Sequence, residues 1–175
     1  YAVDAAATGS TVTIGKPGGP NGKLYIAGKV RAYSAINLNS GSSADGRDID
    51  LDATGVLETI NGSIQFVAGE NGLLQGDISA GGKGSEVLLS SGRSLTIQGL
   101  IQAADRVVLQ GGDGTLIQGQ TSLTLDNTAT IKTMDAGGSI TLAGTNLVYL
   151  DGEVLTTQSS QSITLRSDLG LLSLN

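Results

Sequence analysis

Apolar and polar residues alternate over short runs along most of the chain, and no run keeps the 3.6-residue period of a helix. A period of two places successive side chains on opposite faces of a β-strand. The clearest strand pattern has aliphatic residues at its second and fourth positions, as in Ser139-Ile140-Thr141-Leu142. The chain is therefore predicted to be all-β.

This strand pattern recurs, and from Ile49 onward its first aliphatic residue falls at positions 49, 64, 87, 107, 123, 140 and 163. The gaps between these positions run from 15 to 23 residues, with a mean of about 19. A period near 20 with variable gaps is typical of a solenoid, in which each coil keeps its strands and varies its loops.

A second element precedes most copies of the strand pattern: a small residue, an aliphatic residue two positions later, and Ala or Thr two positions after that. Gly76 to Ala80 and Gly99 to Ala103 are two examples. Its aliphatic residue lies 6, 7, 9, 6, 9 and 9 positions before the one that opens the next strand. Two linked strands in each period indicate a right-handed parallel β-helix with at least two strands per coil.

The predicted architecture is one β-helix segment over residues 1–175, with about eight or nine coils of roughly 20 residues. At about 4.8 Å per coil this gives a rod about 40 Å long. We expect the segment to be a fragment of a longer rod that continues end-on. Residues 15–22, which contain both prolines, are expected to form a loop that leaves the coil.

Composition removes several classes of function. The chain has neither cysteine nor histidine, which excludes thiolate chemistry and the commonest general base and metal ligand. A net charge of −6 disfavours binding to nucleic acid or to anionic lipid. No apolar run approaches the roughly 18 residues that a membrane-spanning helix needs.

Candidate sites are few, and each has a structural interpretation beside the functional one. Asp48, Asp50 and Asp52 alternate along one outer strand face about 6.5 to 7 Å apart, which suits a solvated acidic face better than a Ca²⁺ site. Paired carboxylates would also serve a polysaccharide-degrading enzyme, but such sites use aromatic platforms, and the chain has only four Tyr and one Phe. We therefore expect no catalytic residue, metal or cofactor, and no enzyme activity.

Three further features concern the outer faces and the turns. Thr96, Thr124, Thr141 and Thr164 share a repeat position and could form an exposed column of the kind that binds ice, although Thr is also a favoured outward strand residue. Leu88 and Val108 are expected to form an outward apolar pair that a partner could cover. Residues 111–114, Gly-Gly-Asp-Gly, resemble a single calcium-binding toxin repeat but are expected to form a bend.

The linked repeats resemble those of the filamentous haemagglutinin family, the large exoproteins of bacterial two-partner secretion. Their rods repeat a Gly-x-Ile-x-Ala strand followed by an Asp/Ser-x-Val-x-Leu strand about every 20 residues. The segment from Gly99 to Leu109, Gly-Leu-Ile-Gln-Ala-Ala-Asp-Arg-Val-Val-Leu, matches this best, and the resemblance covers roughly residues 23–174. The family's amino-terminal transport domain and a toxin-like carboxy-terminal segment are not recognisable here.

The resemblance implies the shaft of a secreted adhesin or contact-dependent inhibition protein at the bacterial cell surface. Its function would be reach and display for adhesion or cell-cell contact. Two alternatives stay open: a module on the rod that binds carbohydrate or a host or bacterial surface receptor, and a polysaccharide-degrading β-helix enzyme.

Overall fold

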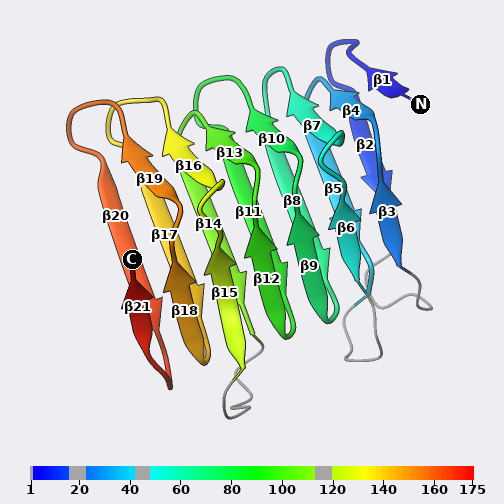
Figure 1. Ribbon diagram of the computed structural model, residues 1–175. Helices are drawn as coiled ribbons and strands as arrows, with labels where there is room; N and C mark the ends of the chain where they lie inside the picture. Colours follow the sequence, from blue (N-terminus) through cyan, green and yellow to red (C-terminus); the bar gives the residue numbers. More distant parts are fainter. Residues whose placement is uncertain (1, 16–22, 42–47, 113–119) are drawn as a thin grey trace.

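The computed structural model describes residues 2–15, 23–41, 48–112 and 120–175, and in this part the chain forms a parallel β-helix of three sheets (Figure 1). Apart from Gly15, the predicted loop at residues 15–22 lies outside the described residues, as do the last two residues of the predicted bend at 111–114. The first and last strands lie at opposite ends of the stack of coils (Figure 1).

Each sheet takes every third strand along the chain. Sheet A consists of β1 (Ala2–Ala5), β4 (Lys29–Ala32), β7 (Val56–Thr59), β10 (Asp77–Ala80), β13 (Leu100–Ala103), β16 (Thr130–Thr133) and β19 (Glu153–Thr156). Sheet B consists of β2 (Thr11–Ile14), β5 (Ala35–Asn39), β8 (Ser63–Ala68), β11 (Glu86–Ser91), β14 (Arg106–Gly111), β17 (Ser139–Gly144) and β20 (Ser162–Ser167). Sheet C consists of β3 (Leu24–Ile26), β6 (Ile49–Leu51), β9 (Asn71–Leu74), β12 (Ser94–Ile97), β15 (Thr121–Leu125), β18 (Leu147–Leu150) and β21 (Leu172–Leu174).

The predicted coil number was too high. The described residues form seven strands in each sheet, so there are seven coils instead of eight or nine. Ile49 and Leu123, counted as coil starts, lie in β6 and β15 of sheet C, whereas the other five starts lie in sheet B. Because a third strand in each coil was overlooked, the coils are longer than expected, from 21 to 30 residues between aligned sheet A positions. Six steps of 4.8 Å separate the end strands by about 30 Å, shorter than the 40 Å expected.

The second sequence element is confirmed as sheet A, and its glycine has a steric reason. A Cβ atom on Gly99 would lie 2.1 Å from the carbonyl oxygen of Gly76, and one on Gly76 would lie 2.1 Å from that of Gly55. At Gly76 and Gly99, successive coils therefore approach too closely at the bend between sheets C and A for a larger residue.

The interior is filled by ladders of aliphatic side chains that run from coil to coil. One ladder of sheet B joins Ile36, Ile64, Val87, Val107 and Ile140, all of which are completely buried. Each such side chain contributes about 1.5 to 3 kcal/mol on burial, and it does so only while a neighbouring coil covers it.

A gap in one ladder is filled from another sheet. Gly72 occupies an inward position of sheet C between Ile49 and Leu95. The ring of Phe66, on sheet B, takes the space together with Leu95: a Cβ atom on Gly72 would lie 2.8 Å from Leu95 Cδ1 and 3.1 Å from Phe66 Cε1. The only phenylalanine of the chain therefore helps to compensate for a missing side chain and to keep the core packed.

Several inward residues of the end coils are the exception to this burial. Val3 in β1 is 48% exposed, Ile163 in β20 is 43% exposed and Leu174 in β21 is 60% exposed. Each continues an internal ladder, since Ile163 aligns with Ile140 and Leu174 with Leu150. Both ends of the described solenoid therefore present apolar ladder residues and strand edges.

The inward and outward assignment predicts unequal effects of two neighbouring substitutions. Ile140→Asp places a carboxylate inside a ladder with no partner and is expected to cost more than about 4 kcal/mol of unfolding free energy. Thr141→Asp, whose side chain points outward, is expected to cost less than about 1 kcal/mol. Urea denaturation followed by circular dichroism measures both, and equal losses would contradict the assignment.

Candidate functional site

The connections between sheets A and B differ in length, and their lengths shape the surface. The connection between β13 and β14 has only two residues, Ala104 and Asp105. The connections on the next coil to either side have five each, residues 81–85 after β10 and residues 134–138 after β16. A short connection between two long ones leaves a hollow at this edge of the solenoid.

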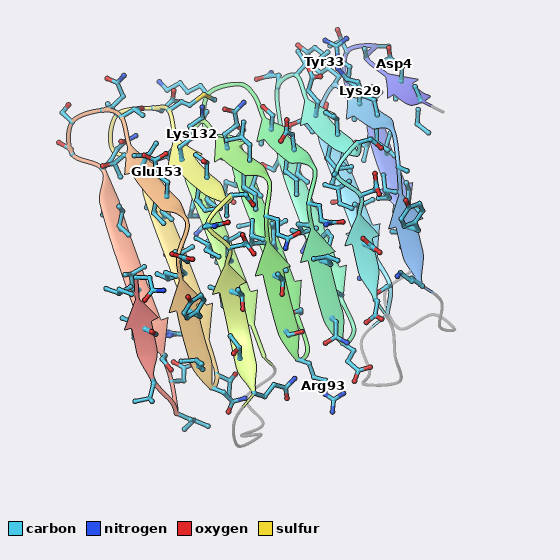
Figure 2. All side chains as sticks on the ribbon, in the orientation of Figure 1. Asp4, Lys29, Tyr33, Arg93, Lys132 and Glu153 are labelled. Atoms are coloured by element: carbon cyan, nitrogen blue, oxygen red, sulfur yellow. The ribbon has the colours of Figure 1, made fainter. Side chains whose placement is uncertain are left out.

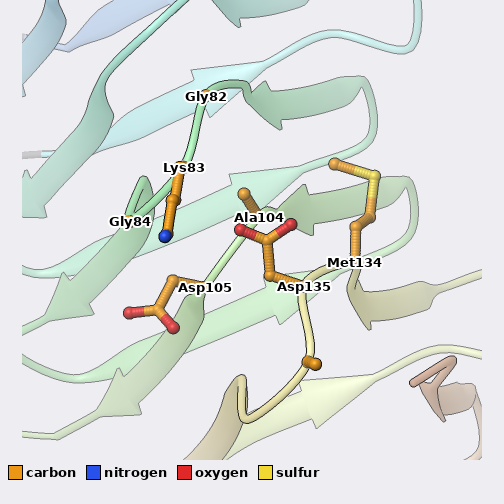
Figure 3. A pocket seen from close by; sticks show the side chains of 8 residues that line it. Gly82, Lys83, Gly84, Ala104, Asp105, Met134 and Asp135 are labelled. Atoms are coloured by element: carbon orange, nitrogen blue, oxygen red, sulfur yellow. The ribbon is translucent and has the colours of Figure 1, made fainter. Parts of the chain in front are cut away.

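We call this hollow the A–B groove. It has a volume of about 770 Å³, and its lining includes Lys83, Asp105, Met134 and Asp135 (Figure 3). The two loops form its walls, and the tight connection at Ala104 and Asp105 forms its floor. Figure 3 shows the charged side chains of three successive coils gathered around one opening.

The floor of the A–B groove is tied to both walls by backbone hydrogen bonds. Asp105 N donates to Ser85 O at 3.0 Å on one side, and Asp135 N donates to Ala104 O at 2.7 Å on the other. The second wall is supported from behind, because Gln161 Nε2 donates to Asp135 O at 2.7 Å. The backbone that carries the charged side chains is therefore held in place before any ligand arrives.

The charged side chains of the groove are not paired with one another. Within the described part of the chain, Lys83, Asp105 and Asp135 make no side-chain hydrogen bond or ion pair. Two carboxylates and one ammonium group therefore face the groove without a hydrogen bond to another side chain of the described protein.

Other charges of the outer faces are paired between coils. Arg106 Nη2 lies 2.9 Å from Glu86 Oε2, and Lys23 Nζ lies 3.0 Å from Asp50 Oδ2. Glu70, which is 7% exposed, is paired with Arg93. Arg93 lies at the edge of the solenoid opposite the A–B groove (Figure 2). These pairs join neighbouring coils, whereas Lys83, Asp105 and Asp135 of the groove form none of this kind.

The three aspartates considered for Ca²⁺ do not converge on one point. Asp48 Oδ1 accepts hydrogen bonds from Asn71 N and Nδ2, both at 3.1 Å, and Asp50 is paired with Lys23. Among the described residues no group of three or more His, Cys, Asp or Glu side chains is placed to hold a metal ion. The alternation along the strand separates the carboxylates, and each one interacts with a different hydrogen-bond donor or cation.

Asp52 belongs to a local network of donors. Its carboxylate accepts from Thr54 N at 2.9 Å, from Thr54 Oγ1 at 2.8 Å and from Tyr25 Oη at 3.0 Å. The backbone and side-chain bonds from Thr54 are the main cause that holds the pKa of Asp52 below its ordinary 3.8, and the bond from Tyr25 adds to it. The same bond to Asp52 raises the pKa of Tyr25.

The predicted column of four threonines is wrong. Thr96 is the neighbour of Thr124 on sheet C, whereas Thr141 is the neighbour of Thr164 on sheet B. The same short pattern occurs on both sheets, so the shared repeat position placed residues of two faces in one column. The four threonines therefore do not form the single array that suggested ice binding.

The outward apolar pair is confirmed as a contact between coils. Leu88 in β11 aligns with Val108 in β14, and both side chains are half-buried. Nothing on the described surface covers the pair further, so the expectation of a partner there stays a prediction.

Comparison with known proteins gives no match to a family model, to a curated protein or to a solved structure. Within the described residues there is no helix with the length and apolar character required to traverse a membrane. The class that the geometry of the described residues defines is a parallel β-helix with a groove at the edge between sheets A and B.

The network around Asp52 predicts a specific pH response. Thr54→Val removes one hydrogen bond to the carboxylate but keeps the backbone N–H, so the pKa of Asp52 should rise part of the way towards 3.8. Because the pKa is lower in the folded than in the unfolded chain, the stabilisation is present above the unfolded pKa and is lost as pH falls through the folded one. Carboxyl ¹³C NMR titration measures the shift. An unchanged pKa would contradict the assigned cause, and Thr96→Val, in β12 and without a bond to Asp52, is the control.

Proposed function

We propose that this chain is a structural shaft of a large secreted bacterial surface exoprotein, that it gives reach and display for adhesion or cell-cell contact, and that it has no catalytic activity. The observation that carries the proposal is the parallel strand pairing that continues through all three sheets from the first coil to the last. Such a stack can lengthen by whole coils without any new type of contact.

The repeat sequence supports the more specific proposal of a filamentous haemagglutinin-like protein of two-partner secretion. The segment from Gly99 to Leu109, which carries the resemblance, falls on β13 and β14, two linked strands of one coil. The proposal assigns the two strands of the family repeat to sheets A and B. We therefore propose an extracellular location at the bacterial surface.

The ends of the solenoid support an end-on partner. A further coil placed in the same register on β19, β20 and β21 would cover Ile163, Leu172 and Leu174, which are 42–60% exposed. We propose that another coil of the same rod packs there. A host or bacterial surface receptor or glycan is the other proposed partner.

Removing one whole coil tests the shaft. Val56 aligns with Asp77, so deleting residues 56–76 removes 21 residues and joins Gly55 to Asp77 in register. The flanking coils can then pair directly, for example with Ile36 beside Val87. The deletion removes Phe66 and Gly72 together, so neither is left without the other. The shortened protein should unfold cooperatively, and small-angle X-ray scattering should show a rod shorter by about 4.8 Å.

The control deletion removes residues 56–66, a length that is not a whole coil. It shifts the remaining strands out of register and should abolish folding. In the complete protein, the 56–76 deletion should keep adhesion or cell contact if the segment acts as a shaft. A folded, correctly exported deletion protein that has lost this function would contradict the proposal.

Location at the cell surface is tested in the organism that makes the protein. Gly9 lies in an exposed turn where an added side chain would meet nothing within 4 Å, so a short epitope inserted there should not disturb the fold. Antibody should label the epitope on intact cells, and external protease should remove it. Labelling only after lysis would overturn the proposed location.

A further inference from the structure

We propose that the A–B groove binds a neutral oligosaccharide. The proposal goes beyond the shaft function, because a shaft needs only its ladders, whereas the groove is made by loops that the ladders do not require. Its volume of about 770 Å³ lies within the range of about 300 to 1,000 Å³ that is usual for small-molecule sites.

The hydrogen-bonding groups of the groove match hydroxyl groups. The carboxylates of Asp105 and Asp135 only accept hydrogen bonds, and the ammonium group of Lys83 only donates them. A sugar hydroxyl does both, so a chain of hydroxyl groups can satisfy all three side chains at once. These side chains come from three successive coils and open into the same hollow (Figure 3).

The charges of the groove favour a neutral ligand. An anionic chain would be attracted by Lys83 but repelled by the two carboxylates, and a polycation would be attracted by the carboxylates but repelled by Lys83. A neutral ligand is repelled by neither kind of charge. The net charge of −6 on the chain adds a further penalty for acidic polysaccharides.

The apolar part of the lining suits the C–H face of a sugar ring. The side chain of Met134 is 38% exposed at one wall, and Ala104 and Ala136 line the hollow beside it. A thioether side chain adapts its shape to a ligand, although it covers less area than an aromatic ring. With no aromatic residue in the lining, we expect a weak site with a Kd of about 1 mM.

The backbone of the groove is already ordered, which lowers the cost of binding. Hydrogen bonds fix the floor to both walls, and the second wall is supported by Gln161. Binding therefore has to order the side chain of Lys83 and that of Met134, but not the loops themselves. Many copies of a rod on one surface would strengthen a weak contact through multivalency.

NMR titration of the ¹⁵N-labelled chain with cellotetraose and maltotetraose tests the proposal. At least one of these neutral probes should shift amide signals of residues 82–84, 104–105 and 134–136, with a Kd of about 1 mM. The double substitution Asp105→Ala and Asp135→Ala should weaken binding at least 10-fold while leaving the melting temperature nearly unchanged. Asp151→Ala is the matched control, since it removes an exposed carboxylate outside the groove and should leave the affinity as it was.

Other outcomes would overturn the proposal. These are the absence of shifts with both probes, shifts outside the groove, or equal affinity in the double variant. Tighter binding of tetragalacturonate, of spermine or of an unstructured peptide would replace the neutral sugar by another ligand class. Release of new reducing ends from the probes would make the site hydrolytic instead of purely binding. The 56–76 deletion leaves the groove residues in place, so failure of the shaft proposal and failure of this one can be told apart.

Discussion

Parallel pairing in fixed register between successive coils is the constraint on which the rest of the structure depends. A shift of one residue would turn every inward side chain of a strand towards solvent. The ladder through Ile36, Ile64 and Val87 therefore gains its burial only if three strands from distant parts of the sequence stay aligned. Close approaches such as that of Gly99 to Gly76, and ion pairs such as that of Arg106 with Glu86, support the same register from the bend and from the outer face.

The constraint acts unevenly on the connections. At the bend between sheets C and A, a Cβ atom added to Gly76 or Gly99 would lie 2.1 Å from a backbone oxygen of the preceding coil. These two positions therefore have no space for a side chain. At the edge between sheets A and B, the loops project outward, and lengthening one costs only slowly increasing closure entropy. Loop length therefore varies at this edge without disturbing the ladders, and the A–B groove is a result of it.

Much of this could be predicted from the sequence. Sheets A and B were predicted because their strands recur as linked pairs, 6 to 9 positions apart, and the inward positions at Ile140 and Ile163 followed from the alternation. The third sheet was missed because β6 and β15 carry the same short alternation as sheet B, and alternation gives the face of a strand but not the sheet to which it belongs. That one ambiguity accounts for both the wrong coil number and the false column through Thr96 and Thr141.

The groove was missed for a different reason, although its signal is present. The spacing between linked aliphatic residues is 9 from Ile78 to Val87, 6 from Ile101 to Val107 and 9 from Ile131 to Ile140. The long, short, long order places a hollow over the middle coil once the strands are known to be in register, as the alignment of Ile101 with Ile78 and Ile131 shows. A list of residue types could not show that Lys83, Asp105 and Asp135 meet, because they are separated by 22 and 30 positions and only the coil brings them together. In a solenoid, therefore, a candidate site is found by comparing loop lengths between adjacent coils, after the ladders have fixed which loops are adjacent.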